Sequence, residues 1–215
     1  MLALLHTSFV HVPVFDALRD ADHPELALRH LVDEELLTRA RAEGPDAVAS
    51  DVESLLMTAV EAGATAVLCT CSTIGGVAED AAGALGVPVL RVDRPMAAVA
   101  ASAGRVAVVA ALESTLEPTL ALIRQEAAGR PVDLRTLLVE GAWERFEAGD
   151  HDGYLDAVAA AVDGITGVDV IVLAQASMAD AAGRTTNGAP VLSSPRPGLT
   201  AAAVRVAKGA ADAAR

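Results

Sequence analysis

The chain has 215 residues, of which 53% are hydrophobic but only 2% aromatic, and its formal net charge is -13. This length is sufficient for a stable core in one or two domains, the composition excludes a disordered chain, and the acidic balance disfavours nucleic acid and anionic membranes as partners. No uncharged apolar run has the length of a membrane span, and the segment from Met1 to Val14 lacks the basic start and cleavage site of a signal peptide. We therefore expect a cytoplasmic protein.

Short runs of Val, Leu and Ile alternate with Ala-rich amphipathic segments, a pattern typical of an α/β protein with mostly parallel sheets. Strands are predicted at 2–6, 27–32, 66–70, 88–92, 106–111, 134–139, 170–174 and 190–192. Helices are predicted at 13–20, 34–42, 46–62, 75–85, 95–103, 116–128, 143–148, 152–166, 178–183 and 198–214.

The predicted strands fall into two sets of four, and the sets resemble each other at an offset of about a hundred residues. The matching segments begin at Leu28 and Leu134, at Ala66 and Val170, and at Pro88 and Pro190. We therefore predict two similar lobes related by a pseudo-two-fold duplication, each with a mostly parallel four-stranded sheet flanked by helices. The first comprises 1–94 plus 195–215, because the last helix is expected to return to it, and the second comprises 95–194. Ligands of open α/β sheets bind at the carboxyl ends of strands, so an active-site cleft is expected between the lobes.

Cys69 and Cys71 are the only cysteines, and because a disulfide between residues two positions apart would be strained, both are expected as free thiols. Neither they nor the five histidines show the spacing of a metal site, so we expect no metal. The single lysine, Lys208, lies in the predicted last helix, which disfavours a pyridoxal phosphate enzyme. Glycine-rich phosphate loops are also missing from the sequence. The sequence therefore predicts chemistry without a cofactor.

The clearest functional signal is the run from Val67 to Gly76, in which an apolar strand leads into hydroxyl residues and glycines. Backbone N–H groups at the start of a helix bind anions and favour a thiolate over a thiol. Cys71, at the strand end beside Ser72 and Thr73, is therefore the candidate reactive thiol. Cys69, inside the strand, is expected to be an ordinary core residue.

Hydroxyl side chains also follow two other predicted strands, with Thr7 and Ser8 after the first and Ser114 and Thr115 after the fifth. They could hold a carboxylate, although serine and threonine at such positions commonly cap helices. No arginine is evident at a strand end. Arg184 and Arg196 lie near the relevant loops and could either recognise a second carboxylate or be solvated surface charges.

Together these features resemble the aspartate/glutamate/hydantoin racemase superfamily. The duplicated lobes, the Thr7-Ser8 loop and the strand and loop from Val106 to Thr115 carry the resemblance, and Cys71-Ser72-Thr73 stands where the family has a Cys-Asn-Thr-like motif. The resemblance implies proton transfer next to a carboxylate without a cofactor, by one cysteine from each lobe. It also implies that Thr73 and nearby amides hold the substrate carboxylate, and that the protein forms a homodimer.

The second lobe departs from the family pattern Gly-Cys-Thr-His, because this chain has Ala174-Gln175-Ala176-Ser177 there. A carboxamide is no acid or base near neutral pH, so racemisation by two thiols is not expected. Gln175 is interpreted either as a donor to a substrate oxygen, with Ser177 as a further binding residue, or as a partner of buried backbone. The prediction is a racemase-like or isomerase-like enzyme that acts on a small carboxylic acid through Cys71.

Several reactions stay open for a single thiol. Cys71 could exchange protons together with another acid such as His6, or add to an unsaturated diacid and permit cis–trans isomerisation, as in the maleate isomerases. It could also protonate an enediolate after loss of carbon dioxide, as in the arylmalonate decarboxylases. A carboxylate-binding protein without catalytic activity is the alternative outside enzymology.

Overall fold

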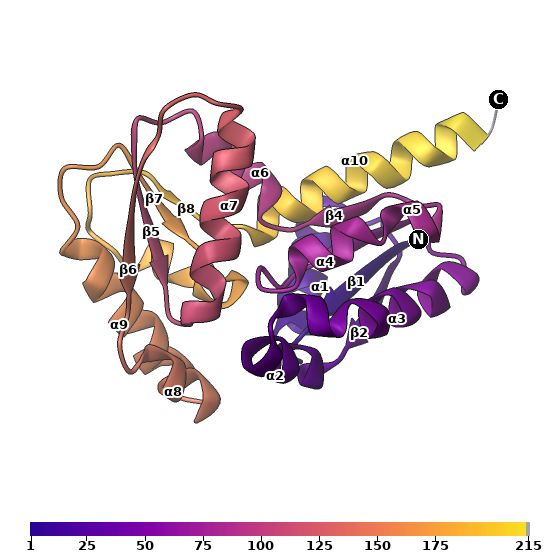
Figure 1. Cartoon of the computed structure of the whole chain (residues 1–215), viewed down its shortest axis with the longest axis horizontal. Helices are drawn as coiled ribbons and strands as arrows, with labels where there is room; N and C mark the ends of the chain where they lie inside the picture. The colour runs from indigo at the N-terminus through magenta and orange to yellow at the C-terminus, as the bar shows by residue number, and fades with distance from the viewer. Residues whose placement is uncertain (214–215) are drawn as a thin grey trace. The chain divides into compact units, whose positions relative to one another are not determined.

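The computed structural model describes residues 1–213 and confirms the α/β class (Figure 1). The chain divides into two compact units, one formed by Met1–Val92 with the segment from Pro195 onward, the other by Asp93–Ser194. Each unit contains one four-stranded sheet. Over the described residues, no helix combines the length and the apolar character that a membrane span requires.

In the first unit the sheet has the order β2-β1-β3-β4 and every pair of neighbouring strands is parallel. Side chains alternate along β1, so Leu2 and Leu4 enter one apolar layer while Ala3 and Leu5 enter the other. The strands are β1 (Leu2–His6), β2 (Leu28–Val32), β3 (Ala66–Cys69) and β4 (Val89–Arg91). One face is covered by α1 (His11–Asp22) and α10 (Pro195–Ala213), and the other by α2 (Glu34–Glu43), η1 (Pro45–Val48), α3 (Ala49–Glu61), α4 (Gly75–Asp80) and α5 (Ala82–Leu85).

The second unit repeats this topology with the order β6-β5-β7-β8, again parallel throughout. Leu2 of β1 pairs with Ala66 of β3, and Val106 of β5 pairs with Val170 of β7. The paired residues are therefore separated by the same number of positions in both units. The strands are β5 (Arg105–Ala110), β6 (Asp133–Leu138), β7 (Val170–Leu173) and β8 (Val191–Leu192). One face is covered by α6 (Arg94–Ala100) and α7 (Leu116–Ala127), which follows η2 (Glu113–Thr115), and the other by α8 (Ala142–Glu147), α9 (His151–Asp163) and η3 (Ala176–Gly183).

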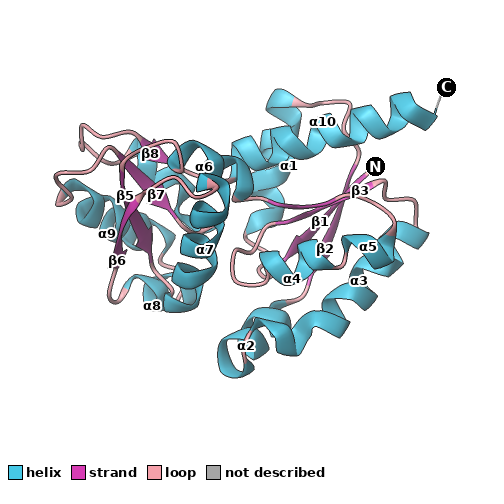
Figure 2. Ribbon diagram, turned by 45° about the horizontal axis from the view of Figure 1, so that its top comes forward, coloured by secondary structure: helices cyan, strands magenta, loops and turns pink. Residues whose placement is uncertain are grey.

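Each sheet is covered in part by a helix that follows the last strand of the other sheet (Figure 2). Helix α6 comes directly after β4, yet its Met96 and Ala97 pack in the core of the second unit. Helix α10 comes after β8, yet its Leu199 and Ala202 pack in the core of the first unit. The last helix thus packs on the sheet of the first unit.

Three of the predicted helices differ from the structure in kind or in continuity. The segment 46–62, predicted as one helix, starts as the 3₁₀ helix η1. Gly44, with a φ of 94°, ends α2, and Pro45 then begins η1. The segment 75–85 is divided at Ala81 into α4 and α5. The segment 178–183 belongs to a 3₁₀ helix. The last helix begins at Pro195, since proline fits the first turn, and its predicted end at 214 lies outside the described residues.

Gly198 lets α10 approach the end of β4 closely. A Cβ atom at this position would stand 2.5 Å from the carbonyl oxygen of Val92 and 2.6 Å from its Cγ2, whereas one at Gly209 would meet nothing within 4 Å. We expect Gly198→Ala to lower the free energy of unfolding by about 1–3 kcal/mol through overpacking. Gly209→Ala, in the same helix, should raise it by up to about 1 kcal/mol through helix propensity. Urea denaturation of both variants measures the difference, and equal effects would contradict the close packing.

Candidate active site

Cys71 lies two residues beyond Cys69, the last residue of β3, at the carboxyl end of the first sheet. It is a free, partly exposed thiol, while Cys69 is fully buried and its Sγ lies 3.6 Å from the carbonyl oxygen of Cys71. The predicted core position of Cys69 is thus confirmed. Ser72 and Thr73, which follow Cys71, are both buried.

The loop with Thr7 and Ser8 leaves the same edge of the sheet as the segment with Cys71. Strands β1 and β3 are parallel neighbours, and Leu5 pairs with Cys69 in their register. Thr7 is buried and Ser8 is partly exposed. The first unit therefore presents a thiol and four hydroxyl side chains at the ends of two adjacent strands.

Arg91 is a buried cation beside this segment, and the expectation that no arginine ends a strand is wrong. It is the last residue of β4, pairs with Cys69 in the register and is only 7% exposed. Its Nε would stand 2.9 Å from a Cβ atom at Gly75, so only glycine at position 75 leaves room for the guanidinium. Arg91 lies near the end of the strand predicted at 88–92, and this position could have identified it as a candidate site residue.

The two arginines named from the sequence lie in ion pairs with surface acids. Arg184 contacts Asp152 at 2.7 Å and Asp156 at 2.8 Å, and Arg196 contacts Asp22. Exposed pairs of this kind contribute little to stability, but they occupy the guanidinium groups. This geometry favours the interpretation of both residues as surface charges over carboxylate recognition.

His6, the last residue of β1, is fully buried, and both of its ring nitrogens have partners. Its Nδ1 lies 2.8 Å from Oγ1 of Thr70, and its Nε2 lies 2.8 Å from Nδ1 of His30. Burial, followed by the charges of His11 and His30, lowers the pKa of His6 to about 3, and burial lowers the pKa of His11 to about 4. These contacts and the lowered pKa favour a neutral imidazole at His6 and count against its role as the acid partner of Cys71.

These lowered pKa values make the folded state sensitive to acid. Between pH 6.5 and about 4 the unfolded chain binds protons at His6 and His11 that the folded chain does not, so stability is lost as the pH falls through this window. We expect the free energy of unfolding to fall by about 2–4 kcal/mol between pH 7 and pH 5. Urea denaturation at both pH values checks this. A pH-independent stability over this range would contradict the buried, neutral histidines.

Gln175 occupies in the second unit the place that Cys71 occupies in the first. The backbone N–H of Thr70 donates to the carbonyl of Leu5, that of Ala174 donates to Val109, and Cys71 and Gln175 are the next residues. The buried side chain of Gln175 does not extend as a free amide, because its Oε1 accepts the backbone N–H groups of Ala111 at 2.7 Å and Leu112 at 2.9 Å. Both partners are donors, so the atom facing them is the oxygen. The interpretation of Gln175 as a partner of buried backbone is supported, and only its NH₂ group is left to donate elsewhere.

The other predicted binding residues of the second unit are Ser114, Thr115 and Ser177. Thr115 is buried at the N-cap position of α7 but makes no capping bond there with its side chain, so the capping interpretation is wrong for it. Ser114 precedes it within η2. Oγ of Ser177 lies 2.8 Å from the hydroxyl of Tyr154, a fully buried side chain of α9 whose pKa is raised by burial. No pattern along the chain marks this pair, because the two residues lie on different elements.

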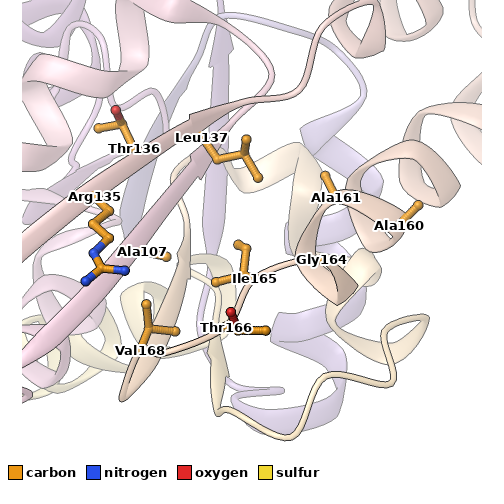
Figure 3. Close-up of a pocket in the computed structure, with 10 residues that line it drawn as sticks. All are labelled: Ala107, Arg135, Thr136, Leu137, Ala160, Ala161, Gly164, Ile165, Thr166 and Val168. Atoms are coloured by element: carbon orange, nitrogen blue, oxygen red, sulfur yellow. The ribbon is translucent and has the colours of Figure 1, made fainter.

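A pocket of about 460 Å³ in the second unit lies away from these strand ends (Figure 3). It is lined by Arg135, Thr136 and Leu137 of β6 and by the loop from Gly164 to Val168. This loop leads into the amino end of β7, whereas Gln175 lies beyond the carboxyl end of the same strand. The pocket therefore contains none of the candidate site residues. Among residues 1–213, no group of three or more His, Cys, Asp or Glu side chains is arranged to hold a metal ion.

Two parallel four-stranded sheets with the same topology, polar residues at their strand ends and a free thiol after β3 define a duplicated α/β protein with a candidate thiol site. The family model for Asp/Glu/Hydantoin racemase matches residues 12–205. The chain belongs to this family. A search of curated proteins finds no match.

Solved structures share the fold at low sequence identity. Glutamate racemase from Francisella tularensis, in complex with D-glutamate, has a TM-score of 0.74 at 11% identity, covering 97% of this chain and 82% of that one. Glutamate racemase isoform RacE1 from Bacillus anthracis has a TM-score of 0.66 at 14% identity, with 97% and 80% covered. Unliganded arylmalonate decarboxylase has a TM-score of 0.59 at 21% identity, with 96% and 91% covered.

Proposed function

We propose that the protein is a cofactor-independent isomerase of the racemase type that acts on a small carboxylic acid through Cys71. The observation that carries this proposal is the free, partly exposed thiol of Cys71 at a strand end, next to the hydroxyl residues Ser72 and Thr73. A thiol in such a position can move a proton to or from the carbon beside a carboxylate. Membership of the racemase family supports the same class of reaction.

The substrate carboxylate is proposed to bind at the edge that carries Thr7, Ser8, Ser72 and Thr73. Hydroxyl groups and backbone N–H groups there would stabilise the enediolate that forms when the neighbouring carbon loses its proton, each donor contributing about 3 kcal/mol. Arg91, which is buried next to Gly75, adds a positive charge to this edge. Ser114, Thr115, Gln175 and Ser177 stay predictions for the substrate-binding role.

Decarboxylation or cis–trans isomerisation is the second candidate. Gln175 favours these one-thiol reactions over racemisation by two bases. Its oxygen accepts two backbone N–H groups, and a carboxamide supplies no second base. Decarboxylation followed by protonation from Cys71, or thiol addition followed by rotation and elimination, needs one thiol only. Both reactions use the same strand end, so the proposed site is common to the two candidates.

Incubation in deuterium oxide with amino acids, hydantoins, maleate and malonates distinguishes the reactions. A racemase-type isomerase exchanges the proton beside the carboxylate of its substrate for deuterium, which proton NMR detects even without net turnover. A decarboxylase releases carbon dioxide from a malonate, and a cis–trans isomerase converts maleate to fumarate. If no compound reacts, while a dicarboxylate still protects Cys71 from alkylation, the protein is a carboxylate-binding module and the enzyme proposal is overturned.

A further inference from the structure

Four side chains of the first unit form a continuous row from the end of β3 to the surface. Oγ1 of Thr70 lies 2.8 Å from Nδ1 of His6, Nε2 of His6 lies 2.8 Å from Nδ1 of His30, and Nε2 of His30 lies 3.3 Å from Oδ1 of Asp16. Thr70 and His6 are buried, whereas the side chain of Asp16 is 42% exposed. The row links a buried hydroxyl, next to Cys71 in the chain, with solvent.

One proton arrangement satisfies the three contacts of the row with neutral imidazoles. The Thr70 hydroxyl donates to Nδ1 of His6, Nε2–H of His6 donates to Nδ1 of His30, and Nε2–H of His30 donates to the Asp16 carboxylate. Each atom in this arrangement is used in accordance with its chemistry, since a neutral imidazole has one donor and one acceptor nitrogen. In this state both histidines carry their proton on Nε2.

A second arrangement fits the same heavy atoms and holds one proton more. The Thr70 hydroxyl then donates to the carbonyl of Leu5, which lies 3.0 Å from its Oγ1. His6 donates from Nδ1 to Thr70, and His30 donates from Nδ1 to His6 and from Nε2 to Asp16. His30 now carries both ring protons beside a carboxylate, and His6 has changed tautomer while staying neutral.

We propose that Thr70, His6, His30 and Asp16 form a one-proton relay, which takes up a proton from solvent at Asp16 and, through the tautomer change of His6, turns the Thr70 hydroxyl from His6 to Leu5. No bond other than N–H and O–H bonds is made or broken, and the added proton comes from water. His6, His30 and Asp16 are positioning residues in this scheme, because they act on the end of β3 through Thr70.

The surroundings of the row support this distribution of charge. The His6 ring faces His11 and Phe15 of α1, whose ring centroids lie 6.1 and 5.5 Å away, and burial lowers the pKa of His6 to about 3. The second arrangement accordingly leaves His6 neutral. There Asp16 accepts from His30 and also pairs with Arg19 at 3.3 Å.

The second unit has no equivalent of this row. By strand register, the places of His6, His30 and Thr70 are taken by Ala110, Thr136 and Ala174. The relay thus occurs only in the unit that carries the thiol. Its link to Cys71 rests on the proposed function, whereas the proton and tautomer changes do not.

Nitrogen-15 NMR of the full chain, labelled in its histidine rings, tests the relay between about pH 5 and pH 8. We expect His6 to change from the Nε2–H to the Nδ1–H tautomer as the pH falls, without becoming charged, while His30 gains its second ring proton over the same range. Constant tautomers at both residues, or a His6 ring that becomes positively charged together with His30, would overturn the relay.

Two aspartates of α1 supply a matched pair of variants, because both contact Arg19. Asp16→Asn should move the tautomer change of His6 to lower pH, and Asp20→Asn should leave it in place; equal shifts would overturn the assigned row. Alkylation of Cys71 is measured in the same samples. If the tautomer change is intact but Cys71 is inert to iodoacetamide, the relay stands and the proposed function fails.

Discussion

Replacing Cys71 with alanine is expected to reduce deuterium exchange or turnover of the substrate by roughly 10²–10⁴-fold, the usual contribution of a general acid or base. The thiol is the acid–base group proposed for this strand end, since its neighbours Ser72 and Thr73 are hydroxyl residues. The rate of exchange at the carbon beside the carboxylate, followed by proton NMR, measures the loss.

Cys69→Ala is the matched control for this experiment. Cys69 is fully buried in the apolar core, so its replacement should affect stability and leave most of the activity of folded protein. Thermal denaturation of both variants separates misfolding from loss of chemistry. Equal losses of activity in the two variants, with both folded, would remove Cys71 from the proposed mechanism.

Replacing Gln175 with alanine is expected to lower the free energy of unfolding by about 2–5 kcal/mol. The change leaves the buried N–H groups of Ala111 and Leu112 without their acceptor, and each unsatisfied donor costs about 1–3 kcal/mol. Urea denaturation at pH 8 measures this loss.

Gln175→Glu distinguishes the backbone role of this residue from a catalytic one. A carboxylate accepts both N–H groups but has no NH₂ group, so the variant should retain most of the stability lost in Gln175→Ala. If its activity also persists, Gln175 serves the backbone alone. If stability is kept while activity falls, its NH₂ group contacts the substrate. A Gln175→Ala protein as stable as the parent would contradict the hydrogen bonds seen at β5.

The sequence predicted the strands well because buried parallel strands are continuous apolar runs, and Leu2–His6 was predicted at its observed bounds. Cys71 was singled out as the candidate thiol for a similar reason, since ligands of open α/β sheets bind at the carboxyl ends of strands. Helix continuity was harder to predict, because the break falls at Ala81, a residue type that favours helix.

The contacts that define the polar network depend on residues brought together from distant parts of the chain. Gln175 meets Ala111 only because β5 and β7 are neighbours, and the sequence left its backbone and substrate roles open. His6 meets His30 across two adjacent strands, and His30 meets Asp16 on a helix. No pattern along the chain marks such a row, since its members lie at unrelated spacings. The buried position of Arg91 at a strand end was missed for a different reason: Arg91 lies within a run that was interpreted only as strand.

The exchange of α6 and α10 between the two sheets affects how the chain acquires its structure during synthesis. When the ribosome has completed β4, the apolar face formed by Leu2, Leu4 and Leu68 still lacks the helix that carries Leu199 and Ala202. The strands of the first unit therefore cannot finish their core until α10 has emerged. Folding of the thiol-bearing unit must wait for α10, whereas the unit translated in between has all its own residues available earlier.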